Sequence, residues 1–445
     1  MTGSAKPVRA TQPVRATPAP PLLGLIEGFY GPPWSWDARD RMIDFLAAHG
    51  FDLYVYAPKD DPLHRARWRE PLPEAELARF ERRARRAARA GVELSYGLSP
   101  IDMAQGDQGA VEALIGKTLQ LQARGIDSFC LLFDDLPEDL PPGRAERTEA
   151  ARWQATVANA MLDAVRAAGS RGRFLFCPTE YCGHGQTPYR RTLGETLEAS
   201  IEVFWTGRQV CSATITRDDL APIARDLRRL PLIWDNYPVN DGEMRGDPHI
   251  RPLRGRAPDL PAACSGIVAN GAIEPEATKI ALHTLAAYRR DPVGYDPEAA
   301  WGPALEAVAG HAADAVALRV LGELTRRSPI EPGGEPPVPW LEACIAITEL
   351  EPRLRRTGQA AAHLIAASAE RPLPREMEPW ARKLHAWVET ARSALGASDA
   401  SDTMALLERA LATPHRVSDG PFEAFVRRRL AAAPGSTASQ VDSRR

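Results

Sequence analysis

Hydrophobic and polar positions change their period once along this chain. From Leu22 to about residue 295, short apolar runs alternate with longer amphipathic stretches, which is typical of repeated βα units. Beyond that point apolar residues recur only at helical spacing, and joints rich in proline and glycine, such as 328–339, separate the stretches. The pattern predicts an α/β domain followed by an all-α domain.

Eight apolar runs are candidate strands, and several of the helix-like stretches between them close on Gly, as a helix C-cap should. The runs cover residues 22–30, 52–58, 93–100, 128–135, 173–181, 202–207, 230–236 and 266–271. Eight βα repeats in about 270 residues match a TIM (β/α)₈ barrel in number and length.

A doubly wound open sheet would also alternate strands and helices. It would carry a Gly-x-Gly-x-x-Gly turn after the first strand and gather its polar residues at one switch point, and the sequence shows neither feature. We therefore predict a barrel over 22–295 and a helical bundle over 296–433. Residues 1–21 are expected to form a disordered leader, and residues 434–445 a disordered tail.

The composition is that of an ordinary globular protein with more than one domain. The 445 residues exceed one hydrophobic core, and a formal net charge of −3 with 44% hydrophobic residues makes nucleic acid a poor partner. The six cysteines stand singly, without a CxxC pair, and are expected to be buried reduced thiols. No apolar run reaches the ~20 residues that cross a bilayer, and the N-terminus lacks a signal peptide's apolar core. We expect a cytoplasmic protein without a membrane partner.

Polar and aromatic residues follow nearly all of the predicted strands. In a (β/α)₈ barrel the carboxyl ends of the strands form the active site, so these residues should converge on one mouth. They are Gly28, Tyr30, Lys59, Asp60, Asp61, Asp134, Asp135, Glu180, Tyr181, Trp205, Thr206, Trp234, Asp235, Asn236, Asn240, Asp241 and Asn270. Each residue alone could be a helix cap, a turn or a packing residue. Together, carboxylates, amides and aromatic rings are what a sugar requires.

Two other kinds of site, for phosphate and for a metal ion, fit the sequence less well. A phosphate site would need a Gly-rich turn at a helix N-terminus, and Lys59 stands alone without one. A metal site could use the aspartates, but barrel metallohydrolases generally supply histidine ligands, and no His-x-His follows any strand. We expect neither a metal nor a cofactor.

Seven motifs in barrel order resemble glycoside hydrolase family 84, the O-GlcNAcases and related β-N-acetylglucosaminidases. They are GLIEGFYGPPW, YVYAPKDDPLHRARWRE, LLFDDL, FCPTEYCG, FWTG, LIWDNYPVND and GIVANGAIEPEATKIALHTLAAY, between Leu22 and Tyr288. The resemblance implies retaining hydrolysis of a terminal β-linked N-acetylglucosamine through an oxazoline intermediate. In this scheme the sugar's own 2-acetamido oxygen replaces the enzyme nucleophile.

The resemblance also implies a role for each matched residue. Asp134 would hold the acetamido N–H as an anion, whereas Asp135 would protonate the leaving oxygen and then deprotonate the water. Two neighbouring carboxylates do not both ionise easily, which fits this division. Tyr181 would hydrogen-bond the acetamido oxygen. The implied substrate-binding residues are Trp234 for the acetamido methyl, Asp241 and Asn270 for the 4- and 6-hydroxyls, and Gly28, Lys59 and Asn236 for other hydroxyl and ring positions.

The resemblance leaves several questions open. We expect a bacterial-type member without an accessory carbohydrate-binding module, and the helical bundle is a candidate for homodimer formation. The substrate would be a GlcNAc-bearing glycoprotein or another glycoconjugate, such as cell-wall or imported glycans. The alternative is a non-catalytic protein that binds or senses GlcNAc with the same pocket, although a binder needs no acid beside the glycosidic oxygen.

Overall fold

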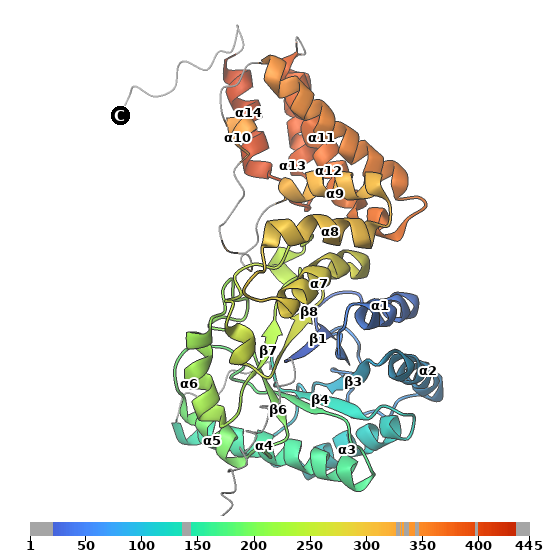
Figure 1. Ribbon diagram of the computed structural model, residues 1–445, viewed down its shortest axis with the longest axis vertical. Coiled ribbons are helices and arrows are strands. Elements are labelled where there is room, and N and C mark those ends of the chain that lie inside the picture. The colour runs from blue at the N-terminus through green and yellow to red at the C-terminus, as the bar shows by residue number, and fades with distance from the viewer. Residues whose placement is uncertain are drawn as a thin grey trace, which may run out of the picture.

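The protein is described by a computed structural model, in which two regions follow each other along the chain (Figure 1). It describes residues 21–135, 144–325, 330, 332, 338–342, 347–396 and 399–432. The predicted tail and all of the predicted leader except Pro21 lie outside these ranges. None of the helices in the described ranges is both long and apolar enough to cross a membrane.

Eight parallel strands close into a barrel in chain order, which confirms the predicted fold class. The strands are β1 (Leu22–Glu27), β2 (Leu53–Tyr56), β3 (Glu93–Leu98), β4 (Ser128–Leu132), β5 (Phe174–Cys177), β6 (Glu202–Trp205), β7 (Leu232–Asp235) and β8 (Gly266–Asn270). All eight were predicted, but each ends earlier than expected. Asp135, for example, lies beyond β4 with φ 48°, a left-handed conformation that an extended strand does not contain.

Helices form the outer layer of the barrel (Figure 1). They are α1 (Trp36–Ala48), α2 (Glu74–Ala90), α3 (Gln108–Gln122), α4 (Arg144–Ala167), α5 (Pro188–Thr196), α6 (Arg217–Leu227) and α7 (Pro275–Arg290). Side-chain caps start several of them: Ser35, Asp107 and Thr187 each accept a backbone N–H of the first helical turn. Such caps fix where each strand-to-helix loop ends.

The prediction of eight βα repeats is wrong at the seventh repeat. Between β7 and β8 the chain forms no α-helix over 236–265, only the 3₁₀ turns η1 (Gly242–Met244) and η2 (Leu260–Ala262). Five prolines in this segment explain why no long helix forms there. The segment is instead held by a side chain from the region that follows the barrel, because Trp301 Nε1 donates a hydrogen bond to the Ile250 carbonyl at 2.8 Å.

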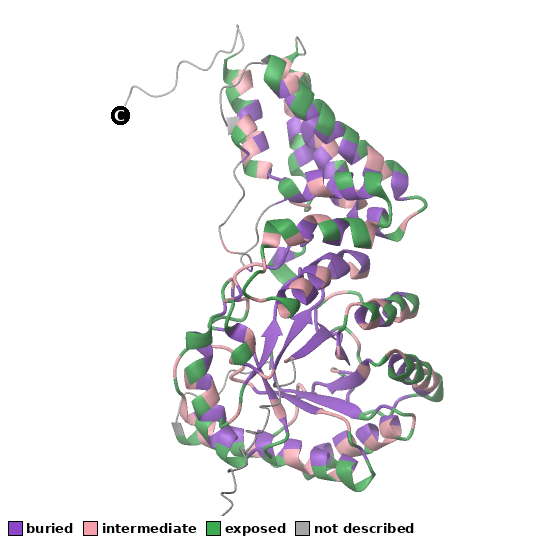
Figure 2. Ribbon diagram, in the orientation of Figure 1, coloured by how far each residue is buried: buried purple, intermediate pink, exposed green. Residues whose placement is uncertain are grey.

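The strands place alternate side chains inside and outside the barrel. Side chains such as Ile26, Val55, Leu132 and Leu175 form one buried cluster inside the barrel. Their neighbours pack outward against the helices in a separate, larger cluster. Figure 2 shows the strands buried along their length, whereas the surrounding helices expose their outer faces.

The C-terminal region, called here the helical domain, comprises α8 (Pro297–Ala309), α9 (Ala312–Glu323), α10 (Pro339–Glu342), α11 (Ile347–Ala367), α12 (Pro372–Leu395), α13 (Ala400–Leu411) and α14 (Asp419–Ala431). Its apolar core contains Trp301, Trp380 and Trp387, all buried. Ile250 and Ile280 from the barrel join the same cluster, so the two regions share packed apolar surface.

Five of the six cysteines fall within the described ranges, and all five are free thiols. Cys130, Cys177 and Cys264 are buried, as predicted. Cys182 and Cys211 are only half-buried, because they lie in the loops that follow β5 and β6 rather than in strands. Cys344 lies outside the described residues.

A carboxylate of the helical domain caps a barrel helix. Glu376, in α12, accepts hydrogen bonds from the backbone N–H groups of Glu276 and Ala277 at 2.9 Å, in the first turn of α7. The amide groups at a helix N-terminus attract such an acceptor. Burial nevertheless dominates and raises the pKa of Glu376 to about 8.

This cap predicts a pH-dependent stability. A carboxyl group whose pKa is raised on folding stabilises the protein fully below its unfolded value and loses that contribution as pH rises through the folded value. Between pH 5 and 8 we expect the wild type to lose about 1–3 °C of melting temperature relative to Glu376→Gln. Thermal unfolding measured at several pH values checks this. The control is Glu378→Gln, on the same helix, whose carboxylate pairs with the exposed Arg382. A difference between the wild type and Glu376→Gln that stays constant over this range would contradict the prediction.

Candidate active site

A cavity of about 280 Å³ opens at the carboxyl ends of the barrel strands. All nine predicted site residues line it: Gly28, Lys59, Asp134, Asp135, Tyr181, Trp234, Asn236, Asp241 and Asn270. Six further residues complete the lining: Tyr30, Cys177, Thr206, Val210, Cys211 and Val239. The structure therefore brings all of the predicted residues together around one cavity.

The strand register explains why six of the nine converge. Inside the barrel, β4 contributes Cys130 and Leu132 to the buried cluster, and the next inward position is Asp134. The same two-residue step leads from Val55 and Ala57 to Lys59. Gly28, Trp234, Asn236 and Asn270 continue the inward positions of β1, β7 and β8 in the same way. These side chains enter the cavity because they extend the register of the core.

Lys59 and Asp134 form a buried ion pair that lines the cavity. Lys59 Nζ donates to Asp134 Oδ2, and the two side chains are only 1% and 7% exposed. The same ammonium is 4.0 Å from Asp135 Oδ2, so it neutralises the two carboxylates unequally. Burial lowers the pKa of Lys59, but the charges of Asp134 and Asp135 outweigh it and raise that pKa above its ordinary value. Lys59 is therefore a permanent cation at neutral pH.

The second carboxylate oxygen of Asp134, Oδ1, differs from the first in its hydrogen bonding. Asp134 Oδ1 is buried and has no hydrogen-bond partner among the described residues. Because a buried carboxylate oxygen without a donor is unfavourable, this atom indicates a place for an N–H or O–H of a ligand.

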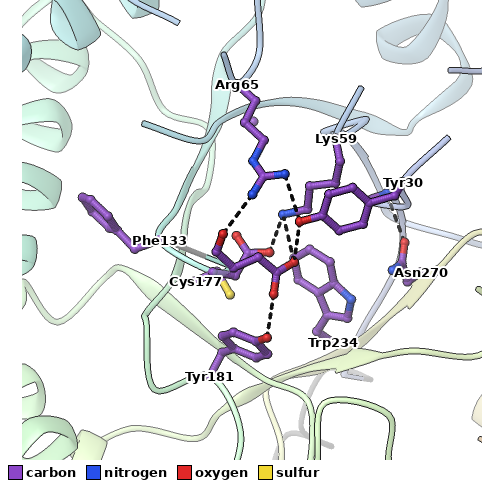
Figure 3. Close-up of polar contacts among 12 residues, drawn as sticks. Tyr30, Lys59, Arg65, Phe133, Cys177, Tyr181, Trp234 and Asn270 are labelled. Atoms are coloured by element: carbon purple, nitrogen blue, oxygen red, sulfur yellow. Dashed lines mark hydrogen bonds and ion pairs between the residues drawn. The ribbon is translucent and has the colours of Figure 1, made fainter. Parts of the chain in front are cut away.

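Asp135 is held by side chains from other loops, with its side chain 34% exposed. Tyr181 donates its hydroxyl to Oδ1 at 2.7 Å, and Tyr30 donates to Oδ2 at 3.1 Å. Arg65 bonds the Asp135 carbonyl and the Tyr30 hydroxyl, both at 2.9 Å. In Figure 3, Arg65 and Tyr181 approach this cluster from opposite sides. These bonds fix a residue whose φ of 48° is otherwise strained.

Both tyrosines donate their phenolic protons to Asp135. Burial raises the pKa of Tyr181, and the negative charge of Asp135 raises it further. Burial and Asp135 also raise the pKa of Tyr30, in spite of nearby Lys59 and Arg65. Both phenols therefore keep their protons at neutral pH.

One wall of the cavity is a chain of amide contacts beside an indole ring. Trp234 Nε1 donates to Asn236 Oδ1 at 2.8 Å, and Asn270 Nδ2 donates to the same oxygen at 3.0 Å. The Gly28 N–H donates to Asn270 Oδ1 at 3.0 Å. Trp234 also packs edge-on against Phe204, with ring centroids 5.3 Å apart. The contacts fix the orientation of both amides and leave the ring as an apolar surface.

Asp241 reaches the cavity from the long connection between β7 and β8. Its Oδ2 accepts the Tyr30 N–H at 2.7 Å. The pKa of Asp241 is raised above its ordinary value. Burial is the main cause, and the charge of Asp135 adds to it, whereas the hydrogen bond from the Tyr30 N–H opposes the increase. The sequence alone could not predict that Asp241 lies in the cavity, because this residue is too far beyond β7 for the alternation of the strand to determine its direction.

Some strand-end residues serve the scaffold instead. Asp235 forms a buried ion pair with Arg256 at 2.6 Å. Glu180 accepts from Thr187 and approaches Arg147 and Arg190 at 3.5 Å. Neither carboxylate lines the cavity, and neither do Asp60, Asp61, Trp205 or Asn240.

Sequence reasoning missed several lining residues. Cys177 follows the inward register of β5 after Leu175, so the alternation of that strand could have identified it. Val210 and Cys211 lie on a loop without such a signal. Burial raises the pKa of Cys211 to about 11, which keeps this thiol protonated and poorly nucleophilic at neutral pH.

The arrangement can hold a neutral, hydroxylated ligand against two carboxylates. Asp134 offers a fixed acceptor, and the more exposed Asp135 can exchange a proton with an atom at the cavity mouth. In the described part of the chain, no three His, Cys, Asp or Glu side chains are placed to hold a metal ion. The expectation of a metal-free and cofactor-free site stays a prediction.

Comparisons with known proteins agree on one family. The family model for beta-N-acetylglucosaminidase matches residues 23–322. Protein O-GlcNAcase from Rattus norvegicus and from Mus musculus are each 35% identical over 275 residues, which is 60% of this chain. The match spans only 30% of the length of these relatives. A solved structure of a Thermobaculum terrenum O-GlcNAc hydrolase mutant is 30% identical, with a TM-score of 0.79 over 92% of this chain and 94% of that one.

The amide wall predicts that Gly28 tolerates no side chain. A Cβ at Gly28 would lie 2.7 Å from Trp234 Cζ2 and 3.1 Å from Asn270 Oδ1. We expect Gly28→Ala to destabilise the protein by about 1–3 kcal/mol in urea unfolding, because the ring has to move. The control is Gly116→Ala in the middle of α3, where nothing lies within 4 Å of the added carbon. That change should stabilise by about 0.5–1 kcal/mol, and similar effects at both sites would refute the crowding argument.

Proposed function

This chain belongs to the β-N-acetylglucosaminidase family, glycoside hydrolase family 84, and from that premise we propose that it is an exo-acting β-N-acetylglucosaminidase. It would hydrolyse a terminal β-linked N-acetylglucosamine with retention of configuration. The nucleophile would be the acetamido oxygen of the substrate, which is an exception to the usual scheme of two carboxylates.

The observation that carries the proposal is the buried, unpartnered oxygen of Asp134 beside Asp135. An N-acetyl sugar supplies one N–H next to its reacting carbon, and Asp134 Oδ1 is an acceptor without a donor. Lys59 holds the other oxygen, Oδ2, so the carboxylate cannot turn away easily. Asp134 is thus suited to orient the acetamido group rather than to attack carbon.

In the first step, the acetamido carbonyl oxygen attacks the anomeric carbon while the bond to the leaving oxygen breaks. Asp135 transfers its proton to that oxygen, so the aglycone leaves as a neutral alcohol. Asp134 accepts the N–H and stabilises the positive charge that develops on the resulting oxazoline ring. Tyr181 would bond the acetamido oxygen, for which its hydroxyl has to exchange Asp135 for the sugar.

In the second step, water attacks the anomeric carbon from the face that the aglycone left. Asp135 takes a proton from this water, and the ring opens to restore the acetamido group. Two inversions at one carbon give net retention. The indole of Trp234 would cover the acetamido methyl, and Asp241 and Asn270 would bind the 4- and 6-hydroxyls.

The finer substrate class is part of the proposal. The named relatives are a protein O-GlcNAcase and an O-GlcNAc hydrolase, and we infer that a protein-linked O-GlcNAc is the leading candidate substrate here. Cell-wall and imported glycans are the other candidates. The cytoplasmic location and a homodimer through the helical domain both stay predictions.

Asp135→Asn tests the catalytic assignment. Loss of the acid should slow a substrate with a poor leaving group by about 10²–10⁴-fold and an activated aryl glycoside far less, because only the former needs the proton. Initial rates with 4-methylumbelliferyl and less activated N-acetylglucosaminides measure this difference. Asp134→Asn should instead slow all substrates alike, because every one of them uses the acetamido nucleophile.

Asp44→Asn is the matched control, since this carboxylate pairs with Arg86 on the outer surface of the barrel. It should leave rates within about twofold of the wild type. Wild-type fluorescence release no greater than that of a blank without protein would remove the enzyme proposal and favour the GlcNAc-binding alternative.

A substrate panel tests the finer proposal. We expect kcat/KM on O-GlcNAc peptides to exceed that on chitobiose and on muropeptides by at least about tenfold. A preference for muropeptides would keep the reaction but replace the substrate class.

A further inference from the structure

The connection between β7 and β8 bears Asp241, and two hydrogen bonds within the connection enclose the segment around that residue. His249 bonds the Pro238 carbonyl at 2.9 Å, and the Tyr237 hydroxyl donates to the Arg251 carbonyl at 2.6 Å. Between these anchors, residues 239–249 form an arch with η1 at its centre. We call these residues the Asp241 arch.

The barrel supports the inner side of the arch through Asn240. Its Nδ2 donates to Glu274 at 2.7 Å and its Oδ1 accepts the Ile273 N–H at 2.9 Å, both just beyond β8. The neighbouring Asp241 is directed to the cavity, where it accepts the Tyr30 N–H. The barrel therefore holds the arch at Asn240, and Met244, at the centre of the arch, is buried in the larger apolar cluster of the barrel.

The helical domain contacts the outer turn of the arch. Arg416 donates to Asp247 Oδ2, to the Glu243 carbonyl and, through its backbone N–H, to the Gly246 carbonyl, each at 2.8 Å. Trp380 Nε1 donates to the same Gly246 carbonyl at 2.7 Å. Asp247 is fully buried, so the guanidinium meets a carboxylate from which water is excluded.

The backbone of the arch at Gly246 and the backbone of the helical domain at Pro414 lie unusually close to each other. A Cβ at Gly246 would lie 2.3 Å from the Pro414 carbonyl oxygen, so only glycine allows the helical domain to come this near. The closeness, the three donations of Arg416 and the indole bond all involve one short stretch of the arch, residues 243–247.

We propose that Arg416 of the helical domain is a positioning residue for the sugar site, which clamps the Asp241 arch so that Asp241 faces the substrate. This inference rests on the proposed function for its kinetic consequence, since Asp241 is the residue assigned to the hydroxyls. The clamp itself is a property of the fold and can be measured without turnover.

The kinetic test is a double-mutant cycle. Arg416→Met should lower kcat/KM on 4-methylumbelliferyl N-acetylglucosaminide by about tenfold, mainly through KM, because the hydroxyl contact is misplaced. In an Asp241→Asn background the same change should cost within about twofold, because the contact it positions is already lost. Arg416→Lys should recover part of the loss, since it restores a charge on Asp247. Equal losses in both backgrounds would overturn the proposal.

The structural test is amide hydrogen exchange over residues 241–249. Arg416→Met should speed exchange there by about tenfold or more while leaving the barrel strands unchanged. The control is Arg427→Met on α14, whose partner is Glu423 on the exposed surface, and it should change neither exchange nor rate. If Arg416→Met does not fold, Trp380→Phe removes the bond to Gly246 and part of a buried ring but keeps Arg416, and it should give a smaller effect of the same kind.

The two readouts separate the failure of the clamp from that of the proposed function. A wild type without hydrolase activity but with faster exchange in Arg416→Met would overturn the function and retain the clamp. Unchanged exchange in both Arg416→Met and Trp380→Phe would overturn the clamp, whatever the wild-type rate.

Discussion

A closed barrel of eight parallel strands allows each strand only one inward register, and the rest of the structure depends on that constraint. Apolar side chains such as Val55, Leu132 and Val268 fill the interior. At the carboxyl ends the next inward positions no longer meet a facing layer and can hold polar groups. Lys59, Asp134 and Asn270 occupy these positions, so the same alternation that packs the core also builds the floor and walls of the site.

The buried ion pair then gives the two neighbouring aspartates different surroundings. Lys59 is committed to one oxygen of Asp134, and its charge reaches Asp135 only at 4.0 Å. Asp135 turns out of the strand through its left-handed backbone and is held by Tyr30, Tyr181 and the Arg65 contact to its carbonyl. One residue step in the chain thus separates an enclosed acceptor from a carboxyl group at the cavity mouth.

This dependence on register also decides what the sequence could predict. The eight strands and most of the site residues were identifiable because apolar runs and polar ends recur with a fixed period. Asp135, Tyr181 and Asp241 were also candidates as strand-end residues, but their roles came from motif resemblance, because they lie on loops whose conformation depends on distant partners such as Tyr30. Val210 and Cys211 have neither signal. The missing helix after β7 was not predicted, although the five prolines of 236–265 could have indicated it. The conformation that replaces this helix could not be predicted, since it depends on contacts from a separate region of the chain.

The helical domain thereby takes the place of a barrel element. Where a (β/α)₈ barrel normally covers the seventh strand with a helix, this chain covers the 236–265 connection with Trp301, Trp380 and Arg416. A covering helix would have shielded the strand but left the loop at its carboxyl end to fold by itself. Contacts from a second domain instead reach the loop directly, at Gly246 and Asp247. With the proposed clamp, the geometry of Asp241 depends on the docking of that domain, and a change at the domain interface would alter the cavity without touching any residue that lines it.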